Sequence, residues 1–162
     1  MFRSGRFVAE GITPVRDGAL DDAAIQPNGV DLTIESVFEQ RSPGRVGREG
    51  KSVGDREERD PDGDDPPTYH LAPGAYVVRY GEVLRVPKGH VGFVLPRSTL
   101  LRNACTLDTA VWDAGYEGRG EGLLQVTHDI EIEQGARIGQ FVLSAADHEG
   151  TYDGSYQGEN VE

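Results

Sequence analysis

The sequence is poor in cysteine, lysine and long apolar segments. Its one cysteine, Cys105, excludes a disulfide within the chain and makes a reducing cytoplasm the expected compartment. No apolar run reaches the roughly 18 residues of a membrane span, and the first residues lack the apolar core of a signal peptide, so no membrane partner is expected. Only two of the 16 basic residues are lysines, Lys51 and Lys88.

The charge is strongly one-sided. Aspartate and glutamate total 28, which gives a formal net charge of -12 at pH 7. No basic stripe offsets this excess, so a nucleic-acid partner is not expected. An acid-rich, lysine-poor surface suits solubility at high salt, where ions screen the repulsion between carboxylates. The composition indicates a cytoplasmic protein of a salt-adapted, halophilic organism, and an ordinary acidic protein is the alternative.

The hydrophobic pattern predicts short strands. Residues 30–38 alternate apolar and polar side chains, as a half-buried strand does. Further apolar runs between residues 75 and 143 are separated by Gly and Pro turns, with no helix-length amphipathic pattern. The 162 residues are therefore expected to form a single all-β domain, 1–162, folded as a barrel or a sandwich.

Two segments depart from this pattern. Residues 39–68 are rich in Gly, Pro and charge, and they cannot bury enough apolar area to offset the entropy of ordering. They predict an exposed hairpin or a partly disordered excursion inside the domain. Residues 147–162 are polar and glycine-rich, and they predict a flexible C-terminal tail that joins no core by itself.

Several kinds of site are excluded by their motifs. The chain has no Walker-type phosphate loop and no dinucleotide glycine fingerprint after a strand. It lacks the His-x-Glu and Pro-Cys-x-x-Cys pattern of zinc deaminases, and its four dispersed histidines with one cysteine make no zinc quartet. No Gly-x-Ser-x-Gly elbow is present, so Ser98 is not expected to be an acyl nucleophile.

One stretch, residues 96–126, concentrates the chemically useful side chains. Two guanidinium groups and two hydroxyls follow a predicted strand directly and suit phosphate oxygens: Arg97, Ser98, Thr99 and Arg102. The alternative is that both arginines pair with surface acids. Asp113 follows an apolar run, which predicts either an enclosed carboxylate of raised pKa that acts as a general base, or the start of a turn. Tyr116 would stack on a sugar or base, or simply pack.

Six motifs then match a known family in their order along the chain. They are Asn28–Leu32, Leu71–Val77, Pro96–Arg102, Ala110–Gly118, Gly135–Phe141 and Ser155–Glu159. The third resembles an Arg-Ser-Ser-Leu-x-Arg motif, and the fourth resembles Gly-x-Ile-Asp-x-x-Tyr-x-Gly. On these motifs the chain resembles the dUTPase / dCTP deaminase superfamily. The resemblance implies a distorted β-barrel or jelly roll that assembles as a homotrimer, with active sites between subunits and the tail closing over a bound nucleotide.

The resemblance also implies roles for individual residues. Asp113 would orient and deprotonate the attacking water, Tyr116 would pack under deoxyribose, and Arg97 and Ser98 would assist the reaction. The backbone of Thr109, Ala110, Val111 and Trp112 would read the pyrimidine. The remaining substrate-binding residues would be Thr99, Arg102, Gln140, Tyr152, Tyr156 and Gln157. Magnesium (Mg2+) would be held through the triphosphate rather than by a cage of side chains.

Two reactions of the superfamily compete. The deaminase branch relies on a Glu in the strand after the hairpin, where this chain has Gln125, and an amide cannot act as a base. The hairpin is also about two residues longer than usual, so Glu121 remains an alternative base for deamination. Hydrolysis of dUTP to dUMP and pyrophosphate is the favoured reaction, dCTP deamination (alone or combined with hydrolysis) is the runner-up, and a non-enzymatic nucleotide-binding regulator is the third possibility.

Overall fold

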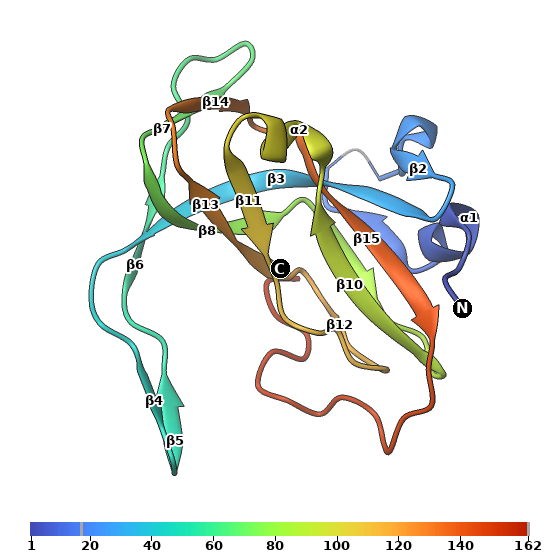
Figure 1. Cartoon of the computed structure of the whole chain (residues 1–162). Coiled ribbons are helices and arrows are strands. Elements are labelled where there is room, and N and C mark those ends of the chain that lie inside the picture. The colour runs from blue at the N-terminus through green and yellow to red at the C-terminus, as the bar shows by residue number, and fades with distance from the viewer. Residues whose placement is uncertain (17, 162) are drawn as a thin grey trace.

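The computed structural model describes residues 1–16 and 18–161, which are built mainly of β-strands (Figure 1). The strands are β1 (Ile12–Pro14), β2 (Ile25–Gln26), β3 (Gly29–Gln40), β4 (Arg45–Gly47), β5 (Gly50–Ser52), β6 (Arg56–Arg59), β7 (Thr68–Leu71), β8 (Gly74–Tyr80), β9 (Glu82–Arg85), β10 (His90–Pro96), β11 (Cys105–Asp108), β12 (Glu117–Gly118), β13 (Glu121–Val126), β14 (Ile130–Glu133) and β15 (Arg137–Ala145). The helices are α1 (Gly5–Ala9), α2 (Ser98–Arg102) and the 3-10 turn η1 (Asp22–Ala24). None of the described helices is long and apolar enough to cross a membrane.

Strand β3 is the centre of the main sheet. The strand order is β10-β15-β3-β8-β13-β11, with β2 and β6 paired to the two ends of β3. All these pairings are antiparallel. Among the twelve residues of β3, Val30, Leu32 and Ile34 are buried, so the apolar positions of the alternation face the core as predicted.

The ends of this sheet curl back toward each other. The hydroxyl of Thr109, just after β11, donates to the carbonyl oxygen of Val94 in β10 at 3.2 Å. Trp112 forms an isolated antiparallel bridge with Gly92 of the same strand. The result is a nearly closed barrel, and the predicted all-β barrel fold is confirmed.

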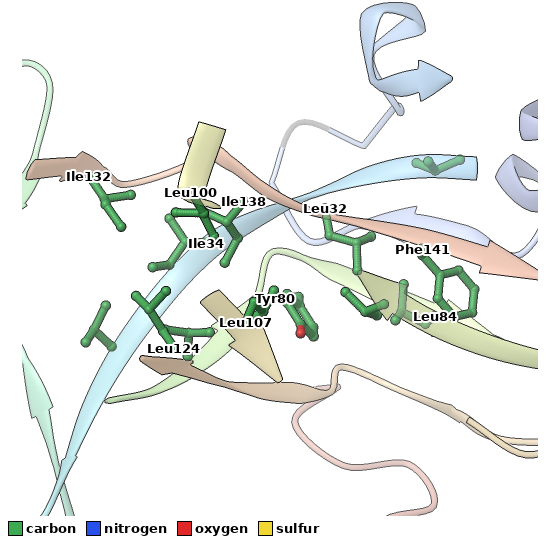
Figure 2. Packing of buried hydrophobic residues seen from close by; sticks show 14 of the residues in the cluster. Leu32, Ile34, Tyr80, Leu84, Leu100, Leu107, Leu124, Ile132, Ile138 and Phe141 are labelled. Atoms are coloured by element: carbon green, nitrogen blue, oxygen red, sulfur yellow. The ribbon is translucent and has the colours of Figure 1, made fainter. Parts of the chain in front are cut away.

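The barrel encloses one apolar core. Figure 2 shows side chains from distant strands meeting there, among them Leu32, Leu124 and Phe141, which are each fully buried. Burying one such side chain contributes about 1.5–3 kcal/mol relative to leaving it in water. The two-residue spacing of apolar positions along β3, β8 and β13 is therefore what selects this fold.

Helix α1 was not predicted from the sequence. Its five residues show no hydrophobic period, and the helix depends on local contacts: the Ser4 hydroxyl caps it by accepting from the Phe7 amide at 3.4 Å. A Cβ atom at Gly5 would overlap the carbonyl oxygen of Gln26, so only glycine fits this contact. The 3-10 turn η1 is capped by the Asp21 side chain, which accepts a hydrogen bond from the Ala23 amide at 2.9 Å.

Residues 41–59, which we call the arm, leave the barrel and return to it. Strands β4 and β5 form a hairpin that projects from the body, and β6 returns by pairing with the end of β3 (Figure 1). At the base of the arm, the Ser42 hydroxyl accepts from the Asp55 amide at 2.7 Å. Arg41 also pairs with Glu57 at 2.6 Å. Residues 41–59 of the composition break thus form a hairpin and a returning strand that bury little.

Glu82 of β9 is a buried acid that is hydrogen-bonded to β3. Only 4% of it is exposed, and its carboxylate accepts from the Thr33 amide at 3.0 Å and the Thr33 hydroxyl at 2.8 Å. Burial raises the pKa of Glu82 from 4.5 to about 7, although the Thr33 hydrogen bonds oppose this shift. The folded protein therefore holds the Glu82 proton more tightly than the unfolded chain does. The stability that Glu82 contributes is fully present below pH 4.5 and is lost as the pH rises through 7.

We expect the free energy of unfolding of the wild type to fall, relative to that of Glu82→Gln, by about 3 kcal/mol as the pH rises from the unfolded-state pKa of Glu82 to its folded-state pKa. Glutamine keeps the shape and an acceptor for Thr33 but does not titrate. Urea denaturation of both proteins across this pH range measures the difference. Parallel pH profiles for the two proteins would contradict the expectation.

Candidate functional site

A cavity of about 410 Å³ lies where the loop after β11, the C-terminal tail and the arm meet. Its lining residues come from these three segments and from the start of β13: Val53, Arg56, Ala110, Val111, Trp112, Asp113, Tyr116, Glu121, Tyr152, Tyr156, Glu159 and Asn160. Seven of the residues proposed from the sequence motifs, and Glu121, therefore share one cavity although they come from three separate parts of the sequence.

Aromatic rings form one wall of this cavity. Trp112 and Tyr116 meet edge to face with their ring centroids 5.0 Å apart. Tyr152 of the tail meets Tyr116 in the same way at 5.6 Å. A Cβ atom at Gly120 would overlap the Trp112 ring, so glycine is required for the hairpin to approach the indole. Tyr116 is 5% exposed, so this ring is covered in the structure rather than open to a sugar.

The tail covers Tyr116 through hydrogen bonds to the residues around it. The Tyr116 hydroxyl donates to Oε1 of Glu159 at 2.9 Å, and burial raises the pKa values of both groups. The Tyr152 amide donates to the Ala114 carbonyl at 2.7 Å, and the Gln157 side chain donates to the Gly115 carbonyl at 3.1 Å. The expectation that the tail joins no core by itself is wrong: Tyr152 packs against the core cluster.

Asp113 lines the cavity and is exposed. The expectation of a carboxylate enclosed by apolar neighbours is wrong, because the chain turns outward between the buried residues Trp112 and Ala114. Within residues 1–16 and 18–161 the Asp113 carboxylate has no hydrogen bond or ion pair. It is therefore free to bind water.

Glu121 has the opposite environment. Arg56 Nη1 lies 2.6 Å from Oε2 of Glu121, and Arg79 Nη2 lies 3.1 Å from Oε1. Both carboxylate oxygens are engaged by guanidinium groups. The side chain reaches the cavity from regular pairing of β13 with β8, opposite Arg79, and not from a bulge. Gln125, further along β13, is exposed and donates to the Asp108 carboxylate outside this cavity.

The backbone expected to read a pyrimidine is only partly available. Trp112 uses both its amide and its carbonyl in hydrogen bonds with Gly92, at 3.1 and 2.8 Å. The backbone of Trp112 is therefore already engaged in this structure, and its expected role in reading the base stays a prediction. Ala110 and Val111 are exposed, and their amides have no hydrogen-bond partner in the described part of the chain. These two amides remain the candidates for base contacts.

The predicted phosphate-binding cluster lies elsewhere in the chain. Arg97 precedes α2, whose first residues Ser98 and Thr99 are exposed, as is Arg102. Trp112 is bridged to Gly92, and Arg97 lies five residue steps further along the extended strand, a distance of about 17 Å. One chain therefore does not bring this cluster to Asp113. Thr99 lines a different cavity, of about 850 Å³, between α2 and the β7–β14 pair.

Asp31 of β3 holds Arg97 in place. Its buried carboxylate lies 3.4 Å from Arg97 Nε and 3.5 Å from Arg137 Nη1, and it accepts from Gln26 at 3.1 Å. Burial raises the pKa of Asp31, and the two arginines oppose this shift. Gln140 of β15 is paired between Asp31 and Leu95, so it belongs to this end of the barrel and not to the 410 Å³ cavity.

Sequence reasoning missed the contributions of Arg56 and Val53 to the cavity. Both belong to the arm, whose composition predicted only an exposed excursion. In the sequence, Arg56 is marked only by its basic side chain, which is a weak signal. In the structure it lies on β6, opposite the end of β3. Asn160, whose side chain donates to the Arg119 carbonyl at 3.0 Å, carries no motif signal.

Comparison with known proteins gives relatives along the full chain. A "Probable deoxyuridine 5'-triphosphate nucleotidohydrolase" of Halobacterium salinarum is 51% identical, with 100% of this chain and 97% of the relative covered. A protein of the same name from Aeropyrum pernix is 41% identical over 99% of this chain and 100% of its own length.

The fold is also found among solved structures. The 2'-deoxycytidine 5'-triphosphate deaminase from Agrobacterium tumefaciens superposes with a TM-score of 0.64 at 19% identity. The match covers 90% of this chain, which spans 48% of that structure. The dCTP deaminase-like family matches residues 3–146, so the resemblance seen in the motifs is confirmed. This chain belongs to the dCTP deaminase-like family.

Proposed function

We propose that this protein is a dUTP diphosphatase, an enzyme that hydrolyses dUTP to dUMP and pyrophosphate. The observation that carries the proposal is the contrast between two acids in one cavity. Asp113 is exposed and unpaired among the described residues, whereas both oxygens of Glu121 are held by arginines. A free carboxylate can accept a proton from water, and an engaged one is poorly placed to do so. The names of the full-length relatives support the same reaction.

In this mechanism Asp113 binds a water molecule and takes its proton as the water oxygen attacks the α-phosphorus. The bond between the α-phosphorus and the oxygen that bridges it to the β-phosphate breaks, and pyrophosphate leaves with that oxygen and the electron pair. Ala110 and Val111 hold the base through their free amides. Tyr116 supports the sugar once Glu159 and Tyr152 have made room for it, and Tyr156 and Gln157 close the tail over the nucleotide.

The phosphate-binding residues come from a second copy of the chain in this proposal. Because Arg97, Ser98, Thr99 and Arg102 lie at the far end of β10, they can reach a nucleotide on Asp113 only from another subunit. A homotrimer is the assembly that the family resemblance implies, and a cyclic arrangement of three copies gives three equivalent shared sites. Gln140, beside Asp31 and Arg97, would contact the substrate from this second side.

In this proposal a magnesium ion is held at the site by the phosphates of the substrate. Within residues 1–16 and 18–161, no group of three His, Cys, Asp or Glu side chains could hold an ion by itself. Magnesium prefers oxygen ligands and is often held mainly by substrate phosphates, which leaves the Asp113 carboxylate available as the base. When bound, the ion neutralises charge on the phosphates during the displacement.

We further infer that the protein works in the cytoplasm of a salt-adapted cell. The buried, unpaired Cys105 is compatible with a reducing compartment. The acid excess of the sequence supports adaptation to salt. One relative at 51% identity comes from Halobacterium salinarum.

Purified protein incubated with dUTP and magnesium should release pyrophosphate and dUMP in equal amounts. A parallel incubation with dCTP should release no ammonia, because Gln125 and the paired Glu121 supply no base for deamination. Chromatography of the nucleotides and a pyrophosphate assay measure both reactions. Ammonia release from dCTP would instead identify a deaminase, and tight nucleotide binding without turnover would identify a regulator.

A further inference from the structure

The arm is part of the candidate site, because it carries a guanidinium group into the cavity. Strand β6 pairs with the end of β3 so that Arg56 lies opposite Gln40. From there its side chain reaches Glu121, which is 65 residues away in the sequence. Val53 of the arm lines the same cavity, and Lys51 places its ammonium 4.5 Å from the ring centroid of Tyr156 in the tail.

The position of Arg56 is fixed from two sides. Its guanidinium lies 5.2 Å from the ring centroid of Phe38, and that of Arg79 lies 4.7 Å from the same ring. Both arginines bind Glu121, and the three side chains are partly buried, with exposures of 24% for Arg56, 21% for Arg79 and 18% for Glu121. Such a network holds a planar guanidinium in one orientation.

This network determines whether the cavity wall presents hydrogen-bond donors or acceptors. Arg56 uses Nη1 for Glu121, and its Nε and Nη2 have no hydrogen-bond partner among the described residues. The wall at Glu121 therefore presents N–H donors, while the carboxylate oxygens that would accept hydrogen bonds are both engaged. Ala110 and Val111 line the same cavity.

Uracil and cytosine differ at the atom that such a wall would recognise. At position 4 uracil carries an oxygen that accepts hydrogen bonds, and cytosine carries an amino group that donates them. A guanidinium donor attracts the uracil oxygen and repels the cytosine amino group. A free carboxylate would have the opposite preference.

We propose that Arg56, carried by the arm and held by Glu121 and Phe38, selects uracil over cytosine in this cavity. This inference rests on the proposed function, because it assumes that the pyrimidine of a deoxynucleotide occupies the cavity. It gives the arm a role in substrate specificity, and it makes Glu121 a positioning residue for Arg56 and not a base.

The test uses the full-length protein and two non-hydrolysable probes, α,β-imido-dUTP and α,β-imido-dCTP. Calorimetry gives the Kd of each probe, and the selectivity is the ratio of the two Kd values. For Arg56→Gln we expect the preference for the uracil probe to fall by about 10-fold or more, which is the effect of losing one hydrogen bond from a charged donor. Because both probes are measured on one preparation, a partly unfolded fraction does not change the ratio.

Two further variants separate a specific role from a structural one. Arg48→Gln removes a charge from the exposed hairpin of the same arm and should leave the ratio unchanged. Glu121→Gln keeps Arg56 but removes the ion pair that positions it, so it should lower the preference by less than Arg56→Gln does. A larger loss in Glu121→Gln than in Arg56→Gln, or an unchanged ratio in Arg56→Gln, would overturn the assignment to Arg56.

Hydrolysis of dUTP and binding of the probes by the wild type show whether only the role of Arg56 is wrong or the proposed function as well. A wild type that hydrolyses dUTP, and whose preference for uracil survives Arg56→Gln, disproves only the role of Arg56. A wild type that binds neither probe disproves the proposed function together with it.

Discussion

Asp113→Asn should lower kcat for dUTP hydrolysis by roughly 10²–10⁴-fold, the usual contribution of a general base. Asparagine keeps the shape of the side chain but cannot take a proton from water. Because Asp113 is exposed and has no side-chain partner among the described residues, the substitution removes no contact of the fold. The expected result is a loss of kcat with little change in KM and in thermal stability.

Steady-state pyrophosphate release measures this effect, and thermal unfolding checks the fold. Asp147→Asn is the matched control, since Asp147 is also exposed, lies outside the cavity and makes no side-chain hydrogen bond or ion pair in the described chain. Its activity should equal that of the wild type. Full activity in Asp113→Asn would exclude Asp113 as the base.

Mixing two inactive variants should restore activity if the site is shared between subunits. One variant is Asp113→Asn, and the other combines Ser98→Ala with Arg102→Ala, which removes two exposed phosphate-binding side chains. In a mixed ring, a site that takes Asp113 from one copy and the phosphate-binding residues from its neighbour can be intact. For random mixing of equal amounts, about a quarter of the sites combine two intact halves, so about a quarter of the wild-type activity is expected.

The experiment requires the variants to be unfolded and refolded together, so that subunits exchange. Variants refolded separately and then combined serve as the control, and they should stay inactive while exchange is slow. Activity that does not rise after joint refolding would place both halves of the site in one chain. Light scattering on the same samples reports the number of subunits.

The strands of the barrel could be predicted because their signal is local. Alternation at Val30, Leu32 and Ile34 reports which face of β3 is buried, and the Pro87–Gly89 turn separates β9 from β10. The motif order identified the family and most cavity residues for a related reason: each motif is a short run of neighbouring residues. Helix α1 escaped prediction because one turn of helix depends on its cap and its packing, and not on a period.

Contacts between distant segments could not be predicted. The pairing of Arg56 with Glu121 depends on the register of β6 on β3 and of β13 on β8, which no short window of sequence encodes. The exposure of Asp113 depends on the direction in which the chain leaves the Trp112–Gly92 bridge. The apolar residues before Asp113 suggested burial because a sequence shows neighbours along the chain, whereas burial depends on neighbours in space.

Trp112 gives this protein a built-in optical reporter. It is the single tryptophan of the sequence, it is 7% exposed, and it lines the cavity beside Tyr116. Light of a wavelength that tryptophan absorbs and tyrosine does not will therefore excite fluorescence only beside the candidate site. Displacement of the tail or entry of a base changes the surroundings of this one indole, so the wavelength and intensity of its emission follow occupancy of the cavity without any attached dye.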